Sequence, residues 1–292
     1  MGNITPAAIA ALAIEFAPAV AFGLAAERVT RAIQRWSIVP RIAVPALYVL
    51  PYILVSASQH IFRWRWFALY AGLPVVVAWL LGQAAAADPE QRANWRDAIV
   101  LLMLGLAVDL RWFDAAWPNG LRALNELLLV DIGLYGFLAI RQLSGTGYDF
   151  HLRWSDWRSG FRELIFFTPL VLVLGLALGF IHPHANLPKA GTAALRWVGI
   201  FCFTAVPEEL FFRAWVQNLL ERRLGRRTAL LIASGLFGLS HFNKRSAHFN
   251  WRYVLLATIA GIFYGRAWRE QRRVPASAIT HASVDWIWGL WF

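Results

Sequence analysis

The sequence predicts an all-α protein, a polytopic bundle of helices embedded in a membrane, and three observations lead to this fold class. Of the 292 residues, 59% are hydrophobic and only 15% are charged, which is too apolar a balance for a soluble domain. Apolar stretches of spanning length recur along the whole chain. The 16 tryptophans agree with this, because Trp gathers at the two interfaces of a bilayer.

Ten apolar segments are expected to form the helices, and we predict about 8–10 transmembrane helices in all. The first segment contains Glu15 and has no basic region before it, so it is expected to span the membrane rather than to be a cleaved signal. The fourth is short and is expected to be tilted or only partly inserted. The segments lie at about 5–26, 42–58, 66–86, 97–110, 124–140, 163–181, 193–220, 228–242, 252–268 and 275–291.

The basic residues between the segments predict a topology. Alternate connections carry 18 arginines and the opposite connections carry nine lysines and arginines. By the positive-inside rule the richer set is cytoplasmic, which places both termini outside and requires an even number of helices. The net charge of +11 is spread between apolar segments, so it does not predict a nucleic-acid surface. A single cysteine, Cys202, excludes an internal disulfide and a multi-cysteine zinc site.

Residues 207–213 (PEELFFR) place two adjacent carboxylates and an arginine in an otherwise apolar run. Each ionised side chain costs about 2.5–3.5 kcal/mol at the middle of a spanning helix, so these groups must be paired or used. Glu209 and Arg213 are four residues apart and are predicted to form an ion pair. Glu208 points about 100° away and remains free for another role. Pro207 is expected to bend or open the helix before the pair.

Two histidines follow in later apolar segments. His241 ends a run of small residues in which Gly235 and Gly238 are expected to let another helix approach closely. His281 and Asp285 are four residues apart and share one helix face. His281 follows Pro275 by six residues, so the last helix must begin deeper or tilt if these groups are to meet Glu208.

The remaining acids of the apolar segments are interpreted without a catalytic role. Glu15, Asp109, Glu126 and Asp131 each lie near a segment end or alone on a helix. We expect them to reach the interface or to make local hydrogen bonds. The polar connection 142–160 is expected to be a cytoplasmic loop between a front and a back half.

The polar set has the parts needed to attack an amide with water: a carboxylate base, a histidine that orients the water, and a second histidine that stabilises negative charge. No serine or cysteine has an evident base and orienting partner. A zinc site is an alternative, with Glu208, His241, His281 and Asp285 as candidate ligands. The usual His-Glu-x-x-His signature is absent from the sequence.

The motifs Glu208-Glu209-x-x-x-Arg213, Phe237-x-x-x-His241 and His281-x-x-x-Asp285 together resemble the pattern of the CAAX-protease and bacteriocin-processing family (CPBP, or Abi) of intramembrane proteases. The resemblance covers residues 190–291. It implies residues 1–160 as variable N-terminal transmembrane helices and 161–292 as the catalytic core. It also implies that Glu208 and His241 activate a water and that His281 and Asp285 stabilise the oxyanion, with Glu209 and Arg213 as structural support.

The resemblance further implies a glutamate-dependent hydrolase without a metal cofactor. Its substrate would be a membrane-associated protein or peptide, and its location a bacterial inner membrane. One departure affects Asp285, because the CAAX-processing branch has Asn there and an ionised Asp cannot donate a hydrogen bond. Asp285 is then protonated, orients His281 or binds a metal. The alternatives are a zinc-dependent protease, or a non-catalytic membrane carrier or immunity protein that uses the cluster as a polar relay.

Overall fold

The computed structural model describes residues 5–184, 188–246 and 248–292 of the protein, and the regular secondary structure of this part is helical. Ten helical segments make up 78% of it, without strands among the described residues. Six of these are long and apolar enough to cross a membrane: Pro6–Gln34, Ile38–Ser58, Trp64–Ala87, Ala123–Ile140, Trp154–Ala177 and Ala190–Leu224. The predicted fold class is confirmed, and the protein is an integral membrane protein.

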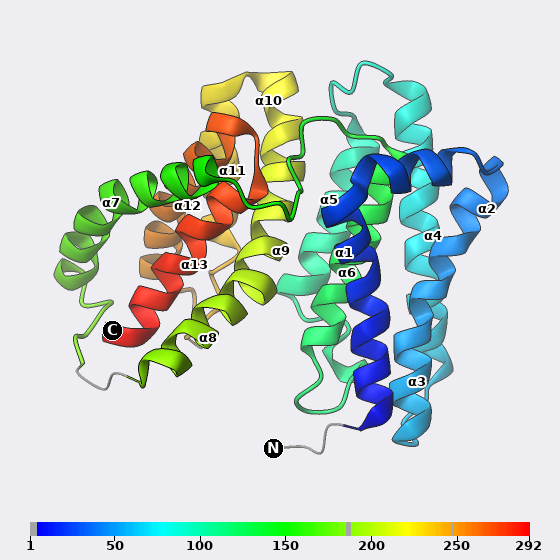
Figure 1. The fold of residues 1–292 in the computed structure, drawn as a ribbon, viewed down its shortest axis with the longest axis horizontal. Coiled ribbons are helices and arrows are strands. Elements are labelled where there is room, and N and C mark those ends of the chain that lie inside the picture. The colour runs from blue at the N-terminus through cyan, green and yellow to red at the C-terminus, as the bar shows by residue number, and fades with distance from the viewer. Residues whose placement is uncertain (1–4, 185–187, 247) are drawn as a thin grey trace. The chain divides into compact units, whose positions relative to one another are not determined.

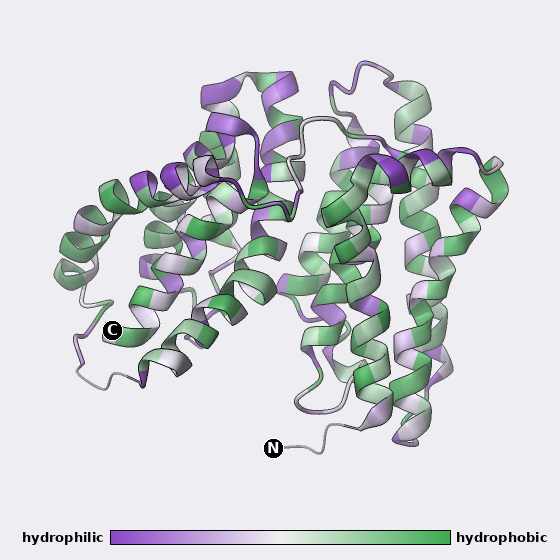
Figure 2. Cartoon of the chain, viewed as in Figure 1, coloured by the Kyte–Doolittle hydropathy of each residue, from purple (hydrophilic) through white to green (hydrophobic). Residues whose placement is uncertain are grey.

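The chain forms two compact units, which meet in sequence between Ser144 and Gly145. The predicted boundary between residues 160 and 161 is of another kind. It divides a variable part from a catalytic part, and it stays a prediction. Polar residues of the second unit gather at the end where α10 and α11 meet, whereas the helix faces below are mostly apolar (Figure 2). This pattern is typical of helices whose apolar faces contact lipid and whose ends reach water.

The first unit contains six α-helices, joined or extended by short 3₁₀ and π segments in its described residues. The predicted segment 42–58 begins earlier, at Ile38, because a 3₁₀ turn continues the helix through this proline-containing stretch. The short helix α5 has 15 residues, about 22 Å, which is less than the ~30 Å of a bilayer core. The elements are α1 (Pro6–Gln34), α2 (Ile38–Ala43), η1 (Val44–Val49), α3 (Leu50–Ser58), α4 (Trp64–Ala87), α5 (Trp95–Asp109), η2 (Asp114–Ala116), α6 (Ala123–Leu134) and η3 (Tyr135–Ile140).

The second unit carries the three motifs. Its described elements are α7 (Trp154–Ala177), α8 (Ala190–Ile200), η4 (Phe201–Ala205), α9 (Val206–Glu209), η5 (Leu210–Gln217), α10 (Asn218–Leu224), α11 (Arg226–Leu239), α12 (Trp251–Gln271) and α13 (Val274–Trp291). Figure 1 shows α7, α12 and α13 grouped together, and α7 and α12 both pack against α13. The expected loop 142–160 is shorter, because α7 begins at Trp154, where Asp156 caps the first turn.

The run α8–α10 is one helical segment of 35 residues with two π-helical stretches. The first, η4, ends just before Pro207, and the second, η5, follows Glu209 directly. Proline lacks the N–H that a regular α-helix needs, and wider π turns are frequent at functional sites. The helix is therefore opened on both sides of the glutamate pair, in line with the effect expected of Pro207.

Close packing between α11 and α12 depends on one of the two glycines singled out in the sequence. A Cβ on Gly238 would overlap the Thr258 side chain and lie 2.6 Å from the Val254 carbonyl oxygen, whereas a Cβ on Gly235 would meet nothing within 4 Å. The expectation for Gly238 is confirmed and that for Gly235 is wrong.

An ion cluster fixes the start of α13. Arg273 donates to both carboxylate oxygens of Asp156, at 2.7 and 3.0 Å, and to Asp149 at 2.7 Å. It also donates to the backbone carbonyl of His151. Partial burial of Asp149 would raise its pKa, but hydrogen bonds from Arg273 and His151 outweigh burial and lower the pKa to about 2. The cluster ties the connection before α7 to the first turn of α13.

We expect Asp149→Asn to reduce the free energy of unfolding by about 2 kcal/mol at pH 7. The folded pKa of Asp149 lies below the unfolded value, so the stabilisation is fully present above about pH 4 and is lost as the pH falls through about 2. Thermal unfolding of the detergent-solubilised protein at pH 7 and near pH 2 measures this. The exposed Glu90→Gln is the control, and an equal loss at both pH values would show that packing rather than charge is responsible.

Candidate active site

The two glutamates of the first motif lie in different surroundings. Glu209 is fully buried, whereas the side chain of Glu208 retains 26% of its exposure. Even so, Oε2 of Glu208 is buried and has no hydrogen-bond partner among the described residues. The 100° between consecutive helical positions separates them as predicted, with one carboxylate inside the core and the other at its edge.

Glu209 holds two partners at once. Its Oε2 accepts from Arg213 Nε at 2.9 Å, the ion pair that helical spacing predicts. Its Oε1 lies 2.9 Å from Nδ1 of His281, a contact across 72 residues that the spacing did not indicate. The guanidinium of Arg213 lies 5.2 Å above the centre of the Phe237 ring. The second glutamate therefore links the first motif to the third.

His281 is buried with both ring nitrogens facing carboxylates. Because Nδ1 contacts Glu209, the other nitrogen, Nε2, points to Oε2 of Glu208 at 3.8 Å and to Oδ2 of Asp285 at 3.6 Å. The ring stacks on Tyr264, with centroids 4.6 Å apart and planes at 16°. Hydrogen bonding at one nitrogen fixes the tautomer, so Nε2 is the atom offered to a reactant.

His241 lies just beyond the end of α11. Its Nδ1 is 2.8 Å from the carbonyl oxygen of Phe237, which can only accept, so Nδ1 carries the proton. The ring packs on Tyr253 at 4.7 Å and on Phe237 at 4.9 Å. His241 and Glu208 are close enough for their charges to interact. In the neutral ring Nε2 is therefore a free acceptor.

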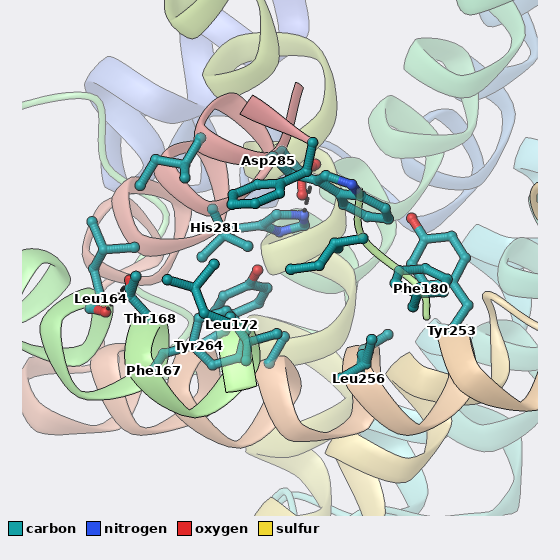
Figure 3. A pocket seen from close by; sticks show the side chains of 18 of the residues that line it. Leu164, Phe167, Thr168, Leu172, Phe180, Tyr253, Leu256, Tyr264, His281 and Asp285 are labelled. Atoms are coloured by element: carbon teal, nitrogen blue, oxygen red, sulfur yellow. Dashed lines mark hydrogen bonds and ion pairs between the residues drawn. The ribbon is translucent and has the colours of Figure 1, made fainter. Parts of the chain in front are cut away.

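A cavity of about 90 Å³ adjoins these groups in the second unit. Figure 3 shows His281 and Asp285 on one wall, and Phe167, Leu172 and Phe180 among the apolar side chains facing it. His241 also lines the cavity, whereas Glu208 is not part of its lining. Glu208 reaches the site through its approach to Nε2 of His281. The structure thus brings the four predicted catalytic residues into one region, with Glu208 at its edge.

Three residues that sequence reasoning missed complete the surroundings. Lys244, in the connection after α11, places Nζ 3.7 Å from Oε1 of Glu208. Tyr264 supports the His281 ring and Tyr253 the His241 ring. Lys244 was counted with the loop charges that set topology, and no local pattern distinguishes it. The tyrosines are three helical turns apart on α12, and this spacing was the only signal for them.

The zinc alternative requires several ligands around one ion. Among the described residues, no three or more His, Cys, Asp or Glu side chains are arranged to hold a metal ion. The candidate ligands Glu208, His241 and His281 do not form such a group in this structure.

Ionised residues that converge on one partly accessible cluster within a membrane-spanning bundle mark a functional site. Residues 190–287 match the family model described as Type II CAAX prenyl endopeptidase Rce1-like. The match confirms the predicted resemblance to the CPBP (Abi) family over residues 190–287. No curated protein and no solved structure gave a significant match. The matched family is one of intramembrane CAAX-type endopeptidases, which act on membrane-associated proteins.

Removing Arg213 should be strongly destabilising. We expect Arg213→Met to cost about 3–5 kcal/mol, because it leaves the buried carboxylate of Glu209 without its cation. The double variant Glu209→Gln/Arg213→Met should unfold at a higher temperature than Arg213→Met alone, since no unpaired charge remains. Thermal unfolding in detergent measures both, with the exposed Arg227→Met as control. Additive losses in the double variant would contradict the pairing.

Proposed function

We propose that the protein is an intramembrane endopeptidase that hydrolyses a peptide bond with a water activated by Glu208 and His241. One observation carries the proposal. Oε2 of Glu208 is buried, accepts no hydrogen bond from a described residue, and lies 3.8 Å from Nε2 of His281. That separation is too long for a direct hydrogen bond, so Oε2 can accept from a water while Nε2 of His281 faces the substrate carbonyl.

The base is Glu208. Its carboxylate takes a proton from the water, and the resulting hydroxide attacks the carbonyl carbon of the scissile amide. Lys244, 3.7 Å away, favours the ionised form that a base requires. His241 has its proton on Nδ1, so its Nε2 accepts the second hydrogen of the water and orients the lone pair toward the substrate.

The oxyanion is stabilised by His281. Glu209 fixes Nδ1 of its ring, and the carboxylates of Glu208 and Asp285 near Nε2 favour a proton there. A hydrogen bond from Nε2–H to the carbonyl oxygen then strengthens as negative charge develops. Asp285 is not needed to orient His281, because Glu209 does so. We assign Asp285 to the oxyanion corner, where its carboxylate lies 3.6 Å from Nε2 of His281 and favours the proton that Nε2 donates.

Collapse of the tetrahedral intermediate completes the reaction. Glu208, now protonated, gives its proton to the amide nitrogen, the C–N bond breaks, and the products are a carboxylic acid and an amine. The atoms of one water are shared between the two products, so no oxidant, reductant or metal is consumed. On this proposal the enzyme is a glutamic-type protease without a cofactor.

The substrate class follows from the location of the site. Glu208 lies in a helical segment long and apolar enough to cross a bilayer, so the scissile bond must belong to a membrane-associated protein or peptide. An apolar cavity beside the catalytic groups suits an apolar side chain next to that bond. We propose the bacterial inner membrane as the location, as the family resemblance implies.

Glu208→Gln should reduce cleavage at least 10²-fold, the lower end of what a positioned base contributes. The measurement uses purified protein and membrane-anchored peptides, including one with a prenylated C-terminal tail. The control is Glu270→Gln, an exposed acid of α12, which should cleave as the wild type does. Cleavage by Glu208→Gln at the wild-type rate would exclude this mechanism.

A chelator tests the cofactor assignment on the same peptides. We expect the rate of wild-type cleavage to be unchanged in EDTA and in 1,10-phenanthroline, because no step uses a metal. Loss of cleavage in chelator, restored by added Zn²⁺, would establish the zinc-dependent alternative with Glu208, His241 and His281 as ligands.

The role of Asp285 predicts a difference between two substitutions. Asp285→Asn should reduce kcat by about 10²-fold, the loss typical of removing one oxyanion donor, because a neutral amide no longer favours the proton that Nε2 of His281 donates. Asp285→Glu keeps a carboxylate and should retain more activity. Steady-state cleavage rates separate them, and equal losses would mean that the negative charge is not what is required.

A further inference from the structure

Two acids of the first unit contradict their interpretation from sequence. Glu15 of α1 and Asp131 of α6 were expected to reach the interface or to make local hydrogen bonds. Instead they are 2% and 1% exposed. None of their four carboxyl oxygens has a hydrogen-bond partner among the described residues. An isolated carboxylate in such surroundings costs far more than a protonated acid.

The two side chains lie near each other. Helices α1 and α6 pack side by side (Figure 1), and Glu15 is close enough to Asp131 for their charges to interact. If both were ionised they would repel each other in a medium of low dielectric constant. The pair therefore has two reasons, burial and mutual repulsion, to carry a proton.

The neighbouring titratable groups supply no compensating cation. Tyr48 of η1 interacts with Asp131 and Tyr70 of α4 with Glu15, while no lysine, arginine or histidine among the described residues hydrogen-bonds either carboxyl group. The hydroxyl of Tyr70 donates to Asn125 and that of Tyr135 to the Arg41 carbonyl. The hydroxyl hydrogens of Tyr70 and Tyr135 are therefore donated to acceptors other than the two acids.

We propose that Glu15 and Asp131 form a proton-binding site in the first unit, in which at least one carboxyl group is protonated at neutral pH. A metal ion such as Ca²⁺ or Mg²⁺ takes six or more oxygen ligands, and the described residues hold no group of three candidate metal ligands. Two carboxyl groups without further ligands can hold a proton. The site belongs to the first unit, whereas the candidate active site belongs to the second, and it goes beyond the proposed function.

Infrared spectroscopy tests the proton directly. The wild type at pH 7 should show a C=O stretching band of a protonated carboxylic acid that is lost in Glu15→Gln/Asp131→Asn. The same band should persist in Glu27→Gln, an exposed acid on α1. Persistence of the full band in the double variant would overturn the proposal.

Unfolding gives a second readout that needs only the wild type if the double variant fails to fold. The folded pair holds protons that the unfolded chain releases above about pH 4–5, so wild-type Tm should fall as the pH rises from 5 to 9. The double variant should show a flatter profile. A wild-type Tm that does not fall over this range would overturn the proposal. A Tm that NaCl raises relative to choline chloride in the wild type alone would also overturn it, because that result indicates a bound metal cation instead of a proton.

Discussion

The site depends on the buried carboxylate of Glu209. One of its oxygens contacts Arg213 and the other contacts His281. A lone carboxylate at this depth would be too costly, and so would a lone guanidinium. Together they neutralise each other and tie the opened helix around Pro207 to α13. Because Glu209 fixes the inner nitrogen of His281, it also decides which nitrogen faces Glu208. Structural support and chemical orientation are the same interaction here.

His281 reaches the level of Glu209 because of how two helical segments are joined at their ends. At the polar end of the second unit, Arg272 donates to Glu221 at 2.6 Å, and Arg273 binds the connection before α7. His281 is nine residues beyond that contact and Glu209 is twelve residues before it. The π-helical stretch η5 lies within the longer path. Its wider turns take more residues for each unit of rise, so both groups reach the same level.

The spacing of residues along the sequence predicted the helices and the contacts within a single helix. The helices follow from hydropathy, and the pairs Glu209–Arg213 and His281–Asp285 follow from the i,i+4 geometry of a helix. The contacts Glu209–His281 and Lys244–Glu208 join residues far apart in sequence, so no periodicity reveals them. Glu15 and Asp131 were misinterpreted for the same reason. A single acid on one helix shows its spacing but not the helix that will cover it.

The contrast between the two walls of the cavity explains how such a site can operate inside a bilayer. His281 and Asp285 lie on one wall (Figure 3), His241 also lines the cavity, and most of the rest of the lining is aliphatic or aromatic. Low polarity around the charged wall strengthens each interaction there, and the same surroundings make an unpaired group expensive. The polar groups must therefore be few and mutually held, as Glu209 and Tyr264 hold His281. On the proposed mechanism, the partial exposure of Glu208 lets water reach the cluster at its edge, so the apolar wall need not admit water.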